Sequence, residues 1–286
     1  MKRFNLCANT HNDAIQYINN RALQIAHTGA ILISIEEFTE GVYALFEFNN
    51  KLYCSIYILN DYRGKNIYYN IWKNKCKILG YTIKILTTSR CALSSYLKHK
   101  NIPHILMNGL TNTAEYKLIE TIYGNSYAKR SGVFYMNHID EGLYILSKLN
   151  ASLESKLGYI IHPIFQSDKQ LRTIYNHTDL TNLTSQALIN AVEYRSVAND
   201  YLSHKMIDDI DDIRLSPLKD VNIMLIADKI QNRKDFELYQ KTHERYNELL
   251  LYFKNWLNVL NISEETYQEL KTQLINISNN SFKYQY

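Results

Sequence analysis

The spacing of the hydrophobic residues changes near residue 110, and this change limits the fold more than any other feature of the chain. Before it, short runs rich in β-branched and aromatic residues alternate with helical stretches, whereas after Ala114 the periodicity is almost entirely helical. Strand and helix patterns repeat over different numbers of residues, so their segregation indicates two structural regions. We predict an α+β protein with an α/β domain over 1–110 and an all-helical domain over 111–286.

The first region is predicted to contain a helix, three strands, a helix, a strand, a helix and a final strand. The helices are expected over Asn12–Ala26, Lys65–Leu79 and Ala92–Lys100, and the strands over Ala30–Phe38, Val42–Phe48, Leu52–Leu59, Thr82–Thr87 and Pro103–Met107. The Asn49-Asn50-Lys51 segment is typical of a hairpin turn. In the second region long helical patterns cover, for example, Ile139–Leu149, Leu183–Leu202, Val221–Ile230 and Arg245–Leu260.

Composition excludes several classes of protein. With 46% hydrophobic and 21% charged residues, the chain has a globular composition. The net charge is +4, and the basic residues are scattered among acidic ones rather than gathered in the stripe of a nucleic-acid binder. Neither a signal peptide nor a membrane span is expected, because no long apolar run is present. The four cysteines form no CxxC pair, which fits a reduced cytoplasmic protein.

Three segments of the second region carry residues of the kinds that bind metals. In Ala128–His138 a basic pair and Ser-Gly precede a histidine; His162 follows an apolar run and precedes Pro163; Asp228 follows a second apolar run and precedes Asn232 by one helical turn. Imidazole nitrogens and carboxylate oxygens suit Mn²⁺, Fe²⁺ or Zn²⁺. Helices can deliver such ligands from separate turns into one bundle core.

Together and in this order, the three segments resemble the metal-binding segments of the HD metallohydrolase domain of the RelA/SpoT type. The resemblance implies that His138, His162 and Asp228 bind a divalent metal (Mn, Fe or Zn). It also implies a nucleotide or another phosphate-bearing small molecule as the ligand. The candidates for binding that substrate are Lys129, Arg130, Tyr135 and Asn232.

The chain departs from this family at the acids that serve the hydrolytic water. Pro163 replaces the Asp of the His-Asp pair, and the following acid pair aligns with Gln166 and Ser167, one residue before Asp168. Glutamine cannot act as a general base at ordinary pH. We keep Gln166 and Asp168 as catalytic candidates. Two histidines and one carboxylate also compose a facial triad for a redox metal, and the three side chains could instead hydrogen-bond one another in a pseudoenzyme.

The first region resembles the GNAT acyltransferase fold in its element order and in the loop Leu59–Asn66 between a strand and a helix. In that family the backbone N–H groups of this loop cradle the pyrophosphate of coenzyme A. Asn66 stands where a second small residue is expected, and asparagine tolerates a left-handed conformation. The resemblance implies acetyl-CoA as a cofactor. Its implied binding residues are Arg63, Gly64, Lys65 and Asn66, with Tyr96 as the general acid and Glu36, Glu37 or Glu47 as the base.

Three functions therefore remain open. The first, which we favour because its motifs cover the longest part of the chain, is a divergent HD-type metal-dependent enzyme. The second is an acyl-CoA-dependent N-acyltransferase with a degenerate HD domain. The third is a non-catalytic protein that binds or sequesters a nucleotide.

Overall fold

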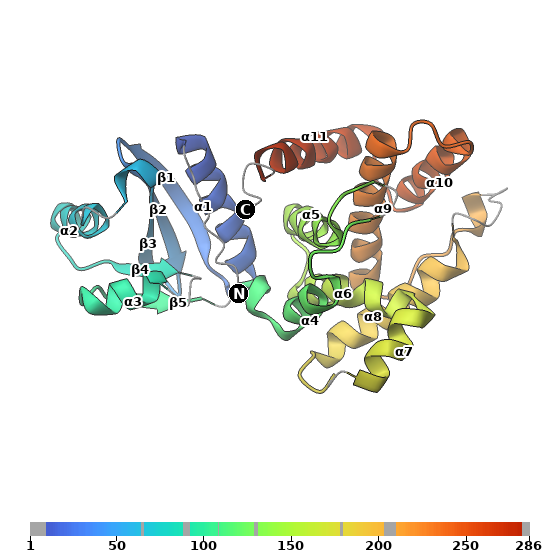
Figure 1. Cartoon of the computed structure of the whole chain (residues 1–286), viewed down its shortest axis with the longest axis horizontal. Coiled ribbons are helices and arrows are strands. Elements are labelled where there is room, and N and C mark those ends of the chain that lie inside the picture. The colour runs from blue at the N-terminus through green and yellow to red at the C-terminus, as the bar shows by residue number, and fades with distance from the viewer. Residues whose placement is uncertain are drawn as a thin grey trace. The chain divides into compact units, whose positions relative to one another are not determined.

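The computed structural model describes residues 10–63, 66–87, 92–107, 109–128, 131–177, 180–202 and 210–281 (Figure 1). As predicted, the protein belongs to the α+β class. Its contacts divide it into two compact units, one made of the chain up to Asn112 together with the residues from Asn279 onward, and the other running from Thr113 to Ser278. Within the described ranges, no helix is both long enough and apolar enough to cross a membrane.

The first unit contains a five-stranded sheet in the order β1-β2-β3-β4-β5. The strands are β1 (Ile31–Phe38), β2 (Gly41–Phe48), β3 (Lys51–Ile58), β4 (Lys84–Thr87) and β5 (His104–Leu106), and the helices are α1 (His11–Ile25), α2 (Ile67–Leu79) and α3 (Ala92–His99). The first three strands pair antiparallel, whereas β4 pairs parallel with both β3 and β5. All eight elements predicted for this region are present.

Local sequence signals explain where several of these elements begin and end. Asn49 and Asn50 have φ values of 50° and 55° in the β2–β3 hairpin, where asparagine is among the few residues that adopt positive φ easily. Helix α1 begins at a capping box, because the Thr10 hydroxyl accepts from the Asp13 N–H and the Asp13 carboxylate accepts from the Thr10 N–H. Gly80, at φ 73°, ends α2.

Two hydrophobic clusters, one on each face, cover the sheet of the first unit. Tyr53 and Tyr57 of β3 belong to the cluster that packs against α1, whereas Cys54 and Ile56 belong to the cluster that packs against α2 and α3. Successive side chains of a strand point to opposite faces, which accounts for this division. Figure 1 shows α1 on one side of the sheet and the other two helices on the opposite side.

The second unit is helical. Its helices are α4 (Ala114–Tyr123), α5 (Tyr135–Lys148), α6 (Leu153–Gln166), α7 (Asp168–His177), α8 (Ser185–Asp200), α9 (Lys219–Tyr239), α10 (Tyr246–Val259) and α11 (Glu264–Ser281). Among its described residues, the β-structure is an isolated bridge between Tyr127 and Phe134. Helix α6 lies at the centre of this unit and contacts α4, α5, α7, α8 and α9. Its central position brings His162 into the core.

The end predicted for the helix at Val221–Ile230 was wrong. Helix α9 continues to Tyr239, nine residues further, through a polar stretch. Arg233, Lys234 and Glu237 of this stretch are only 2%, 3% and 9% exposed. Buried charges of this kind require partners from neighbouring helices, and a hydrophobic pattern cannot reveal those partners.

Candidate metal centre

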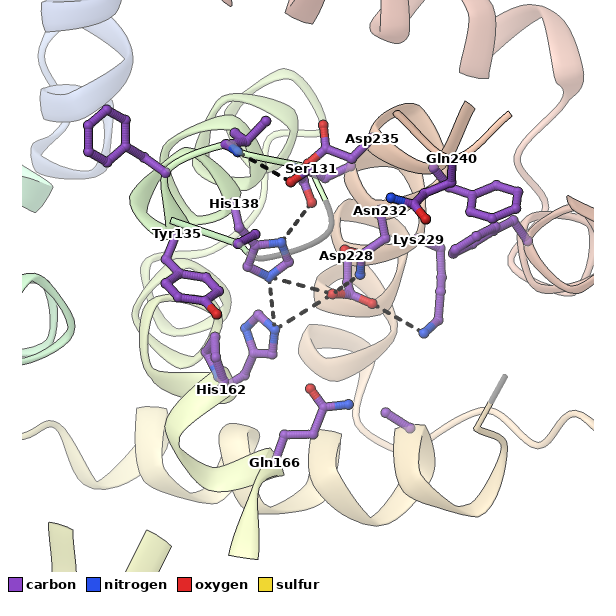
Figure 2. A pocket seen from close by; sticks show the side chains of 18 of the residues that line it. Ser131, Tyr135, His138, His162, Gln166, Asp228, Lys229, Asn232, Asp235 and Gln240 are labelled. Carbon is purple, nitrogen blue, oxygen red and sulfur yellow. Dashed lines mark hydrogen bonds and ion pairs between the residues drawn. The ribbon is translucent and has the colours of Figure 1, made fainter. Parts of the chain in front are cut away.

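Three helices of the second unit bring His138, His162 and Asp228 together. Their side chains, from α5, α6 and α9, point toward one another in Figure 2. The two histidine Nε2 atoms are 3.3 Å apart, and each is 3.6 Å from Oδ1 of Asp228. One ligand atom from each residue lies within 4.8 Å of the others. Residues far apart in the sequence thus form one group of potential metal ligands.

The His138 ring is oriented by Gln231. The Gln231 amide nitrogen donates to Oε2 of Glu141, at 3.0 Å, and to Oδ2 of Asp235, at 2.8 Å. The side-chain oxygen Oε1 of Gln231 is an acceptor, and it lies 2.7 Å from Nδ1 of His138. Nδ1 of His138 must therefore carry the hydrogen in this contact, which leaves an unprotonated Nε2 in the neutral ring. That lone pair faces the centre of the cluster.

The His162 ring is oriented in the same way by a backbone group. Its Nδ1 lies 2.6 Å from the carbonyl oxygen of Tyr159, which can only accept. Nε2 of His162 is therefore also the unprotonated nitrogen of the neutral ring. The side chain is 1% exposed, and this burial lowers the pKa of His162 against the opposing pull of Asp228. Burial therefore favours the neutral form, the form that binds metals.

Asp228 is held as a carboxylate. Its burial alone would raise its pKa, but opposing charge, first of all that of the Lys229 ammonium, outweighs burial and holds the pKa of Asp228 well below its usual range. Lys229 Nζ lies 3.1 Å from Oδ2. The Asn232 amide donates to Oδ1 at 2.8 Å. The cluster thus combines one ionised carboxylate with two imidazoles whose Nε2 atoms face it.

The cluster opens into a pocket of about 480 Å³. Aromatic side chains form much of its wall, namely Tyr123, Phe134, Tyr135, Phe236, Tyr252 and Phe253. Polar side chains surround the metal candidates, namely Ser131, Gln166, Lys229, Gln231, Asn232, Asp235 and Gln240. A pocket with an apolar wall and a few convergent polar groups is the usual form of a small-molecule site.

Only some of the residues expected to bind the substrate or to catalyse the reaction lie at the pocket. Tyr135, Asn232 and Gln166 line the pocket, and Gln166 points toward the cluster (Figure 2). Asp168 is 72% exposed, forms an ion pair with Arg195 and is not among the lining residues. The expected phosphate ligands Lys129 and Arg130 lie outside the described residues.

The coenzyme A candidates belong to the first unit. Arg63 donates to the carbonyl oxygen of Ile58 at 3.1 Å and to the Tyr57 hydroxyl at 2.8 Å. Asn66 adopts the left-handed conformation, with φ 55°, at the start of α2. Tyr96 lies on α3 and is partly buried in the hydrophobic cluster between the sheet and helices α2 and α3. Burial raises the pKa of Tyr96. Gly64 and Lys65 lie outside the described residues, and the candidate base Glu36 forms an ion pair with Lys75.

Sequence reasoning missed the residues that orient the ligands. Glu141 and Gln231 each follow a ligand by three residues, which places them about one helical turn away on the same face. That spacing could have marked them as neighbours of His138 and Asp228. The contact that matters, from Gln231 to His138, joins residues 93 positions apart and has no local signal.

Comparisons with known proteins add no name to this site. No family model, curated protein or solved structure matches the chain at a significant level. What the pocket does must therefore be inferred from its own residues.

Proposed function

We propose that the second unit is a divergent HD-type metal-dependent enzyme that acts on a nucleotide or another phosphate-bearing small molecule. His138, His162 and Asp228 would hold one divalent metal ion. The supporting observation is that two imidazole Nε2 atoms lie 3.3 Å apart while the Nδ1 of each ring is already hydrogen-bonded to an acceptor. If both rings are neutral, this arrangement directs their two Nε2 lone pairs at each other, and a cation or a shared proton between them would relieve that conflict.

The spacing of the three ligand atoms fits one ion. Atoms about 2.1 Å from a common ion, separated by angles of about 90–120°, lie roughly 3.0–3.6 Å apart. The three separations here are 3.3, 3.6 and 3.6 Å. Two nitrogens and one carboxylate oxygen suit Mn²⁺, Fe²⁺ or Zn²⁺. When bound, such an ion supplies a Lewis acid and a more acidic water molecule.

The chain's own residues would position both the ligands and the substrate. Gln231 and the Tyr159 carbonyl hold the two imidazoles. The aromatic wall, with Phe236 and Phe253, offers flat apolar surface to a planar group such as a nucleobase. Gln166 presents a neutral amide, which can donate to a substrate oxygen but cannot take up a proton as a carboxylate would.

Metal content tests this proposal most directly. The purified protein would be reconstituted in turn with Mn²⁺, Fe²⁺ and Zn²⁺, dialysed and assayed by elemental analysis. We expect about one equivalent of metal in the wild type, lost in His162→Ala and kept in His243→Ala, which removes a histidine of the same unit outside the cluster. No bound metal after reconstitution would overturn the proposal and favour a proton shared between the imidazoles.

Turnover separates an enzyme from a binding protein. The metal-loaded protein would be incubated with guanosine tetraphosphate and with nucleoside triphosphates, and products would be followed by chromatography. Conversion that His138→Ala abolishes is the expected result. Nucleotide affinity without conversion would support the non-catalytic alternative.

A second candidate function belongs to the first unit. Asn66 begins α2 in the left-handed conformation without a side-chain cap, so the first N–H groups of that helix have no cap from this residue and could bind an anion. We propose coenzyme A as the ligand of an N-acyltransferase reaction there. Calorimetric titration with coenzyme A tests it: binding that weakens in Arg63→Ala but not in Lys77→Ala, which changes the other end of α2, is expected. No heat of binding in the wild type would remove this candidate.

A further inference from the structure

The two oxygens of Asp228 face different groups. Oδ1 faces the two histidines, at 3.6 Å from each Nε2. Oδ2 faces Lys229, whose Nζ lies 3.1 Å away. A carboxylate can bind a metal through one oxygen or through both. In Asp228 the second oxygen already has a cationic partner.

Lys229 is itself fixed on the side away from Asp228. Its Nζ lies 3.3 Å from the Tyr252 hydroxyl oxygen and 5.0 Å from the centre of the Trp256 ring. The Tyr252 hydroxyl donates its own hydrogen to the Tyr201 carbonyl, at 3.1 Å, so its oxygen is available to accept from Lys229. The lysine is 5% exposed. It is therefore a positioned donor and not a mobile surface cation.

We propose that Lys229 is a positioning residue that restricts Asp228 to a single metal-facing oxygen. This inference rests on the proposed metal site. Three ligands that each give one atom leave more of the coordination sphere open for substrate than a carboxylate bound through both oxygens would.

The positive charge of Lys229 also affects the net charge of the metal site. The Lys229 ammonium offsets the Asp228 carboxylate, and two neutral imidazoles add no charge. A divalent ion in this setting keeps a net charge of about +2 instead of the +1 that the carboxylate alone would leave. An anionic substrate group would be attracted to the metal more strongly for that reason.

A purely structural role for Lys229 gives a different expectation. A lysine that only compensates a buried carboxylate would, when removed, lower stability and alter metal affinity without changing how the carboxylate binds. Affinity alone therefore does not distinguish the two roles. The two roles are distinguished by the number of Asp228 oxygens that bind the metal.

The visible absorption of the Co²⁺-loaded protein reports this number, because Co²⁺ absorbs less per ion as its coordination number rises. Lys229→Met keeps most of the aliphatic side chain and removes the donor, whereas Lys229→Arg keeps a cationic donor. We expect Lys229→Met, once saturated with Co²⁺, to show a lower molar absorption than the wild type, because its Asp228 would bind through both oxygens. Lys229→Arg should keep the wild-type spectrum. Lys271→Met is the matched control. It removes a lysine of α11 that pairs with Glu237 of α9, away from Asp228.

Saturated spectra that are the same in Lys229→Met and the wild type would overturn the role of Lys229 and leave the metal site standing. Failure of the wild type to bind Co²⁺ would overturn both. If Lys229→Met does not fold, infrared difference spectra of the wild type with and without Zn²⁺ decide the question. A wide separation of the two carboxylate stretching bands is expected for one-oxygen binding by Asp228, and a narrow separation would contradict it.

Discussion

Two polar networks lie along helix α9, and they differ in how their donors and acceptors match. In the Arg233 network, Arg233 donates through Nε to Glu237, at 2.9 Å, and through its two terminal nitrogens to Glu264, at 2.8 and 2.7 Å. Glu237 also accepts from Tyr267 and Lys271. In the metal-ligand cluster of His138, His162 and Asp228, two imidazole Nε2 atoms and a carboxylate oxygen face one another, while the Nδ1 of each ring already contacts an acceptor.

This difference in the matching of donors and acceptors distinguishes a structural network from a candidate functional site. A network in which each donor meets an acceptor stabilises the fold without help. A cluster in which acceptors face acceptors lowers stability unless something is bound, and such local conflict is typical of functional sites. The Arg233 network should therefore respond to mutation by loss of stability, and the metal-ligand cluster by loss of ligand.

The largest expected effect on stability is that of Arg233→Met. Arg233 is 2% exposed, and its loss would leave Glu264 without its two-pronged cationic partner and Glu237 with Lys271 as its remaining ion pair. We expect the free energy of unfolding to fall by about 3 kcal/mol, the lower end for a broken buried ion pair, because Glu264 is half exposed. Urea denaturation followed by far-ultraviolet circular dichroism measures this loss.

Arg245→Met is the matched control for that experiment. Arg245 also pairs with a glutamate, Glu248, but both side chains reach solvent, so the loss should be much smaller than in Arg233→Met. Equal losses in the two variants would contradict the view that the Arg233 network holds α9 to α11.

The second prediction concerns the metal itself. At a metal concentration about 100 times the dissociation constant, binding should stabilise the wild type by about 2.7 kcal/mol relative to the chelator-treated protein. His138→Gln should lose this gain while the metal-free variant stays within about 1 kcal/mol of the metal-free wild type. Thermal unfolding with Zn²⁺ or with chelator measures both. A metal-free His138→Gln as unstable as Arg233→Met would show that the cluster is structural.

The third prediction concerns Gln231, the link between His138 and the buried pair of Glu141 and Lys234. Gln231→Leu keeps the size of the side chain and removes the acceptor for His138 Nδ1. Metal affinity should fall by about 10- to 100-fold, as for other groups that orient a metal ligand. Competition with a coloured chelator measures the affinity. Gln268→Leu, which changes an exposed glutamine of α11, is the control, and an equal effect there would contradict the role of Gln231.

These networks also show which parts of the structure the sequence could predict. Runs of β-branched and aromatic residues located β1 to β5, because this preference for strands lies within each short segment and needs no distant partner. The order of the three motifs predicted His138, His162 and Asp228 as metal ligands from the sequence alone. The extension of α9 through Arg233 could not be predicted, because its partner Glu264 lies 31 residues away and a polar stretch normally indicates a surface or a loop.

The smallest expected effect, and the one that compares the networks in a single titration, is that of pH on the metal-free protein. Burial lowers the pKa of His162 below its ordinary value of 6.5. In the Arg233 network, burial alone would raise the pKa of Glu237, but Lys271 and Tyr267 outweigh it and lower the pKa from 4.5. Both shifts are downward on folding, so each contributes stability that is present above the unfolded pKa and lost as pH falls.

The two losses should occur in different pH ranges. Stability that depends on His162 should begin to fall below pH 6.5, whereas stability that depends on Glu237 should begin to fall only below pH 4.5. Urea denaturation of the chelator-treated protein across this range should therefore show a shallower decline from pH 6.5 to 4.5 in His162→Ala than in the wild type. Arg233→Met should keep the wild-type slope there, because the groups that it disturbs are still ionised. A change of slope in Arg233→Met but not in His162→Ala would reverse the assignment of the two networks.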